Sequence, residues 1–382
     1  MRPRIPVIAA LSAAIAACLY FFLSGKSSVS TVARDTTADS RSFPQSADAA
    51  GKYPVRENPS EAAEKNPAVN RKRFGALTDS KDADELFPAI TSEDIARFLA
   101  KHGETAGNLV AAFDKTHDRQ LLERALELFP NSPIVLMSAV DSAPASPAPK
   151  PGETYQSNPQ RMEFIERFKT ADPSNPLPWI FSAQELFKTK QTAEGLAEIR
   201  AALERPAFYT YANERMDGAQ RLYEDAGMSP VEASLLAMVG LTLPHMTAAQ
   251  QASRSLMEWQ KSAADSGDTG AADDAIRLTY DLGRTFATPE ASRTLLGQLV
   301  GVSMEARALK ALPADAQPAW LVVAPAQRLA EMETQKQNVR DLTAGFDWVM
   351  QSQNENLLAE YLRRNRQDGE LSALTWLKTQ RK

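Results

Sequence analysis

The chain has 382 residues, of which 43% are apolar and 24% are charged, and its formal net charge is −5 at pH 7. This length and apolar content suffice for a core and favour one or two folded domains. The slightly acidic balance argues against a nucleic-acid-binding protein. The single cysteine, Cys18, excludes an internal disulfide framework.

The amino terminus carries an apolar segment preceded by Arg2 and Arg4. The run from Ile5 to Leu23 is about 19 residues long, close to the ~20 that a helix needs to cross a bilayer. Because basic residues favour the cytoplasmic side, the chain is predicted to be a single-pass protein of the cytoplasmic (inner) membrane with its bulk on the periplasmic side. Two alternatives stay open. Residues 15–18 resemble a lipobox, which would make the protein a lipoprotein anchored through Cys18, and an ordinary signal would be cleaved.

Composition divides the rest of the chain. After the anchor or signal at residues 1–24, residues 25–84 are rich in Ser, Thr, Asp, Ala, Pro and Lys, with isolated apolar residues. Such a segment cannot bury enough area to offset its ordering entropy and is predicted to be a disordered linker. Helical patterns follow in residues 85–207 and in residues 208–382, and they predict an all-α fold.

The clearest pattern lies between Asp172 and Pro206. Prolines punctuate the start of a first predicted helix, whose apolar residues from Trp179 onward recur at helical spacing. Thr192 can cap a second helix, and Pro206 ends it. Neither short helix can bury its apolar stripe alone, so we expect the two to pair and to have a neighbour on each flank.

This helix pair resembles the tetratricopeptide repeat, in which two helices approach closely at small residues. The match is degenerate, because Ser182 departs from the pattern and Pro206 falls one position early. Two weaker units precede it within residues 99–207, one of them split by a proline-rich loop at residues 142–159. The positions that carry the resemblance are Trp179, Ser182, Ala183, Leu186, Gly195, Ile199 and Pro206.

The resemblance implies a solenoid of helical hairpins whose first helices line a concave surface for a partner. On the central unit it would direct Ile180, Gln184, Phe187 and Lys188 toward this groove. The implied partner is another protein or peptide, and Lys188 beside an aromatic residue could hold a peptide carboxylate.

The second half keeps helical periodicity but loses the repeat, and is predicted to continue the solenoid into a larger α-helical domain. Capping patterns predict helix starts near Thr91, Ser229 and Thr247. The Gly297-x3-Gly301 spacing is typical of close helix packing, here in a soluble core because its flanks are polar.

No residue pattern indicates catalysis, a cofactor or a metal. The three histidines lack ligand spacing, and no phosphate-binding glycine loop or nucleophile elbow occurs. The sequence therefore favours a membrane-anchored, non-enzymatic scaffold or adaptor that binds protein in the bacterial cell envelope. An envelope enzyme acting on cell-wall polymer and a purely structural subunit of an envelope complex are the alternatives. The oligomeric state and the partner stay open.

Overall fold

The computed structural model of the protein describes residues 90–143, 155–205, 208–288, 293–352 and 354–381. Every helix or strand that it assigns within these ranges is an α-helix, which confirms the predicted all-α class. The predicted anchor, Cys18 and the linker at residues 25–84 lie outside the described residues.

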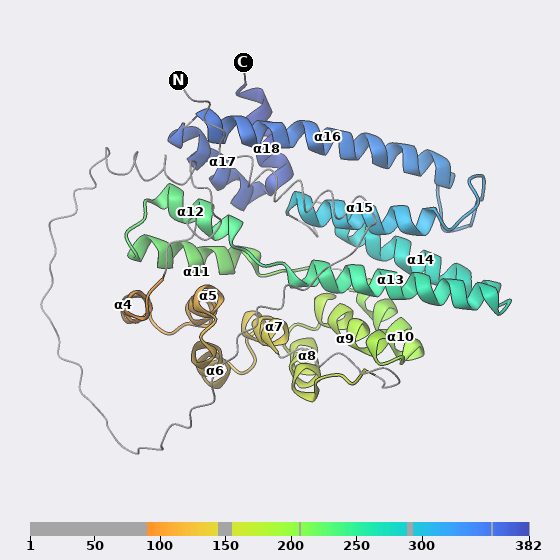
Figure 1. Cartoon of the computed structure of the whole chain (residues 1–382), viewed down its shortest axis with the longest axis horizontal. Helices are drawn as coiled ribbons and strands as arrows, with labels where there is room; N and C mark the ends of the chain where they lie inside the picture. Colours follow the sequence, from red (N-terminus) through yellow and green to blue (C-terminus); the bar gives the residue numbers. More distant parts are fainter. Residues whose placement is uncertain (1–89, 144–154, 206–207, 289–292, 353, 382) are drawn as a thin grey trace, which may run out of the picture.

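A first layer of seven helices forms a row along one side of the molecule (Figure 1). Helices α5 and α6 pack as a pair, as do α7 and α8, and α9 and α10; α8 also contacts α9, and α5 contacts α7. The row therefore contains the three helix pairs that the sequence predicts between residues 99 and 207. Its helices are α4 (Ser92–His102), α5 (Ala106–Thr116), α6 (Arg119–Leu128), α7 (Pro133–Ser142), α8 (Pro159–Ala171), α9 (Leu177–Lys188) and α10 (Thr192–Leu203).

Local signals explain where these helices begin. The Thr91 hydroxyl accepts from the Asp94 amide at 3.1 Å, and the Asp94 carboxylate accepts from the Thr91 amide at 3.0 Å, which forms the predicted capping box of α4. Helices α7 and α8 begin with Pro133 and Pro159, where the missing amide costs no helical hydrogen bond.

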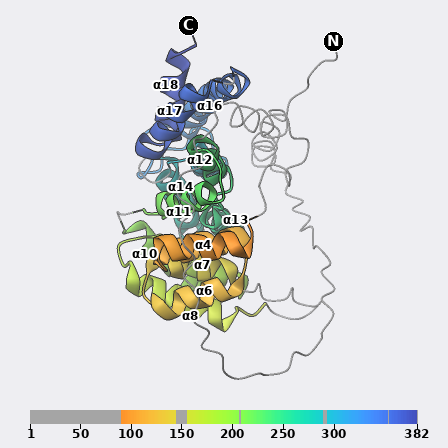
Figure 2. The same ribbon diagram turned by 90° about the vertical axis from the view of Figure 1, so that its left-hand side faces the viewer.

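A second layer lies across the first helices of the pairs (Figures 1 and 2). Helix α11 packs antiparallel on α5 and α13 packs on α9. Gly218 permits the first of these approaches, because a Cβ there would lie 2.6 Å from the Cβ of Ala111. The face that a solenoid would leave open is therefore covered at α5 and α9. The helices of this layer are α11 (Ala212–Asp225), α12 (Pro230–Val239) and α13 (Pro244–Asp265).

The remaining helices stack beyond the second layer (Figure 2). Helix α14 packs against α13 and along α15, and α15 contacts α16. Gly301 lies in this α14–α15 contact, as the glycine spacing predicts for a packed core. These helices are α14 (Thr269–Ala287), α15 (Leu295–Leu309), α16 (Pro325–Ser352), α17 (Glu355–Asp368) and α18 (Glu370–Thr379).

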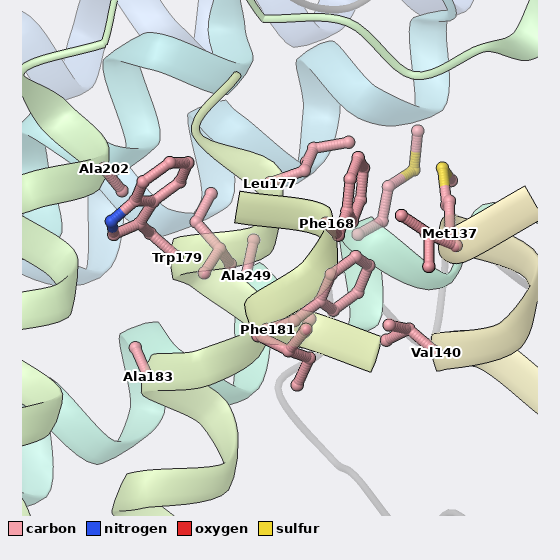
Figure 3. Packing of buried hydrophobic residues seen from close by; sticks show 14 of the residues in the cluster. Met137, Val140, Phe168, Leu177, Trp179, Phe181, Ala183, Ala202 and Ala249 are labelled. Atoms are coloured by element: carbon pink, nitrogen blue, oxygen red, sulfur yellow. The ribbon is translucent and has the colours of Figure 1, made fainter. Parts of the chain in front are cut away.

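One large core joins the first two layers. Figure 3 shows Met137 and Val140 of α7 near Phe168 of α8 and Phe181 of α9, in a cluster that also includes Ala249 of α13. The same cluster extends to buried residues of α14 and α15. Residues on both sides of position 207 therefore share this core. A separate cluster joins α12, α15, α16, α17 and α18.

The second half confirms one predicted helix start and corrects another. Ser229 forms the predicted capping box with Glu232, but Thr247 caps nothing, because α13 already begins at Pro244. The stretch 230–265 is long and apolar enough to span a bilayer by length and composition. In the fold this stretch comprises α12 and α13, which are interrupted near Gly240 and contribute buried residues to the core.

Candidate functional site

Three carboxylates lie in the last turns of the first helix of each of the three pairs. Asp114 belongs to α5, Asp141 to α7 and Glu185 to α9. The carboxyl end of a helix carries partial negative charge, so an acidic side chain there needs a compensating cation. The structure supplies such cations nearby. We call the three carboxylates and these cations together the charged edge; the cations are Lys115, Arg161, Lys188 and Arg215.

Glu185 forms one end of the charged edge. Its side chain is 1% exposed and accepts from Arg161 Nε at 3.2 Å, Lys188 Nζ at 2.8 Å and the Tyr155 hydroxyl at 3.2 Å. Arg161 also donates to the carbonyl of Val140 at the end of α7. Glu185 therefore links the start of α8 to the end of α9, and Arg161 extends this link to α7.

Asp114 forms the other end of the charged edge. It pairs at 2.8 Å with Arg215 of α11, whose side chain is only 4% exposed and also donates to the Thr242 hydroxyl at 2.9 Å. The neighbouring Lys115 donates to the carbonyl of Gly240 at 3.2 Å, and its Nζ lies 5.6 Å from the centroid of the Tyr223 ring. Burial lowers the pKa of Lys115, although Asp114 acts in the opposite direction.

Asp141 lies between these two ion pairs. The surrounding protein raises the pKa of its carboxyl by desolvation, while the nearby Arg215 and Arg161 act in the opposite direction. Among the described residues no cation comes within ion-pair distance of Asp141, although its side chain is on the surface. Asp141 is therefore the carboxylate of the row that remains available to a partner.

The four residues predicted to line a groove occupy the same part of α9, but three of them are buried. Ile180 lies in the core, and Phe187 contacts Gly195 of α10. Gln184 donates to the side-chain oxygen of Gln251, so α13 lies over this position. Lys188 keeps 35% of its side chain exposed and belongs to the charged edge. A partner approaching α9 would therefore meet Lys188 rather than the other three.

The sequence analysis did not single out Arg161, Glu185, Asp141 or Arg215. One signal for the carboxylates was readable, because an acidic residue near the end of the first helix in each of the three pairs opposes the usual preference for cations there. The arginines could not be assigned, because Arg215 meets Asp114 from 101 positions away in the chain.

Metal and cofactor sites were not expected from the sequence. Within the described ranges no group of three or more His, Cys, Asp or Glu residues is placed to hold a metal ion. His245 is buried beside Phe208 and Phe286, whose ring centroids lie 6.2 and 6.3 Å from that of the imidazole and 4.8 Å from each other. Burial lowers its pKa to about 3, so this imidazole is neutral in the fold.

No family model, no curated protein and no solved structure matches the chain.

Proposed function

We propose that the chain is a membrane-attached, non-catalytic scaffold that binds another protein or peptide on the extracytoplasmic side of a bacterial cell envelope. The attachment rests on the amino-terminal apolar segment, and the sequence of residues 99–207 resembles the tetratricopeptide repeat. The observation that carries the binding function is the charged edge, where Lys188 and Asp141 reach the surface beside two ordered ion pairs.

The charged edge has two properties that suit protein recognition. The ion pair with Glu185 already holds Lys188 in place, so this surface side chain would lose little entropy when a partner binds. The charges of the edge are of both signs, which favours a partner with a complementary pattern over a purely acidic or basic ligand. The cations are Lys115, Arg161, Lys188 and Arg215, and the anions are Asp114, Asp141 and Glu185.

Site-directed photocrosslinking in the native membrane tests the proposal. A photoreactive residue at Ser142, which is exposed beside Asp141, should capture one protein at near-stoichiometric yield. The same residue at Glu123, on the exposed side of α6, is the matched control and should capture much less. Reversing the charges of Asp141 and Lys188 together should weaken capture about tenfold, the effect of ~1.4 kcal/mol. Equal capture from both positions, or capture indifferent to charge reversal, would exclude the charged edge as the binding surface.

One observation favours a second candidate, an envelope enzyme acting on cell-wall polymer. A carboxyl whose pKa is raised by burial can serve in acid–base catalysis, and desolvation raises the pKa of Asp141 against the opposing effect of Arg215 and Arg161. Purified full-length protein should then degrade cell-wall polymer, and Asp141→Asn should abolish the turnover. Absence of turnover in the wild-type protein removes this candidate.

A further inference from the structure

A cavity of about 520 Å³ lies where the segment before α15 meets the junction of α17 and α18. Small-molecule sites are typically ~300–1,000 Å³ in volume, so this cavity is large enough to hold one. It shares no residue with the charged edge. Its lining includes a cation, an anion, hydroxyl groups and two apolar side chains; these residues are Arg293, Asp368, Ser372, Thr375, Leu371 and Trp376.

Hydrogen bonds across the junction fix the walls of the cavity. The Glu370 amide donates to the Arg293 carbonyl at 2.8 Å, and the Leu295 amide donates to the Glu370 carboxylate at 2.8 Å. The Arg293 guanidinium also donates to the Gln367 carbonyl. Gly369 permits this close approach, because its φ is +86° and a Cβ there would lie 3.2 Å from the Arg293 carbonyl oxygen. A ligand would therefore enter a preformed site, where binding costs little reorganisation.

Arg293 and Asp368 bring charges of opposite sign to the cavity. Both side chains are exposed, and among the residues that the structure describes neither lies within ion-pair distance of an opposite charge. Asp368 occupies the last turn of α17, where the helix dipole disfavours an anion, so its carboxylate does not stabilise the helix. An anionic ligand would be repelled by Asp368 and a cationic one by Arg293. A ligand that carries one ammonium and one carboxylate group would satisfy both.

The rest of the lining suits a ligand with a hydrocarbon group and an amide. Leu371 and Trp376 are partly buried, and the Arg364 guanidinium lies 4.7 Å from the centroid of the Trp376 ring, which it restrains. The Thr375 hydroxyl donates to the Leu371 carbonyl at 2.8 Å, which leaves its oxygen as an acceptor for a ligand amide.

We infer that this cavity binds a short zwitterionic peptide with an apolar side chain. Arg293 holds the carboxylate of the peptide and Asp368 holds its ammonium group. The apolar side chain packs on Leu371 and Trp376. This site is independent of the charged edge and of the protein partner proposed there.

Isothermal titration calorimetry of the full-length protein in neutral detergent tests the inference. The dipeptide leucylalanine should bind saturably, with one site per chain. Its N-acetyl derivative and its carboxyl-terminal amide each lack one charge, so each should bind about tenfold more weakly than the free dipeptide. Glycylglycine keeps both charges but lacks the apolar side chain, so it should also bind more weakly than leucylalanine.

Matched variants assign the two charges. Asp368→Asn should weaken leucylalanine binding about tenfold but leave the affinity for the N-acetyl derivative unchanged, because that ligand has no ammonium group. Arg293→Gln should show the same pattern with the amide derivative, which has no carboxylate. Arg277→Gln, on the exposed surface of α14, is the control and should bind leucylalanine like the wild type.

The Asp368 variant separates a loss of binding from a loss of folding. Asp368→Asn removes an anion from a helix end that disfavours it, so its Tm should not fall below that of the wild type. The inference is overturned if leucylalanine does not bind, if either derivative binds as tightly as the free dipeptide, or if Asp368→Asn keeps the wild-type affinity for leucylalanine.

Discussion

Gly283 of α14 and Gly301 of α15 bring two helix backbones into direct contact. A Cβ on Gly283 would lie 2.8 Å from the Gly301 carbonyl oxygen, and one on Gly301 would lie 2.6 Å from the Gly283 carbonyl oxygen. Because backbone atoms occupy this space, neither helix can accommodate a methyl group without moving. We therefore expect Gly283→Ala and Gly301→Ala each to lower the free energy of unfolding by about 3 kcal/mol, as measured by urea denaturation.

Gly107 of α5 provides the control for this prediction. A Cβ there would meet nothing within 4 Å, and its φ is not positive. Gly107→Ala should thus be neutral or stabilise the protein by up to ~1 kcal/mol through helix propensity. If all three substitutions change the urea midpoint alike, the α14–α15 contact is looser than the structure indicates.

Local features of the fold were predictable where few residues decide them. The capping box at Thr91 depends on a residue three positions away, and it forms as predicted. The predicted cap at Thr247 is wrong, because Met246 and Ala248 are buried and the helix that carries them begins earlier, at Pro244. Burial of an apolar face outweighs a single capping pattern.

The arrangement of the helix layers could not be predicted from the sequence. An apolar stripe shows that a helix face is buried but does not identify the element that covers it. The groove predicted on α9 assumed an open concave surface, whereas Gln184 meets Gln251 of α13, 67 positions further along the chain. Only Lys188 of the predicted set belongs to the exposed part of the candidate site.

Glu185 should contribute strongly to stability. Its carboxylate is buried and compensates Arg161, whose side chain is only 15% exposed. Glu185→Ala would leave this guanidinium without its counter-charge, so we expect a loss of about 3 kcal/mol in urea denaturation. The exposed pair of Arg119 and Glu123 is the comparison, since Glu123→Ala should cost less than ~0.5 kcal/mol. Similar losses at both positions would contradict a structural role for Glu185.

Gly195 and Phe187 define the close approach of α9 and α10. A Cβ on Gly195 would lie 2.7 Å from Cε1 of the Phe187 ring, so a side chain rather than backbone occupies the space. We expect Gly195→Ala to destabilise by about 1–2 kcal/mol, because the buried ring must shift. Adding Phe187→Leu should recover part of this loss, and a double-mutant cycle measures the coupling. Strictly additive effects would show that the two residues do not compete for space.

His245 should make stability depend on pH in the acidic range. Its pKa is about 3 in the fold, below the ~6.5 expected in the unfolded chain. As pH falls from about 6.5 toward 3, the unfolded state takes up a proton that the folded state excludes, so stability decreases with falling pH. Protonation of this one group can change the free energy of unfolding by at most about 1.4 kcal/mol per pH unit.

Replacing the imidazole isolates this contribution. His245→Phe keeps an aromatic ring beside Phe208 and Phe286 but cannot be protonated, so its free energy of unfolding should decline less steeply between pH 6.5 and 4 than that of the wild type. Phe208→Leu alters the same packing without changing a titrating group, and it should lower stability by a constant amount across this range. A His245→Phe profile parallel to the wild-type profile would show that the buried imidazole does not contribute to acid sensitivity.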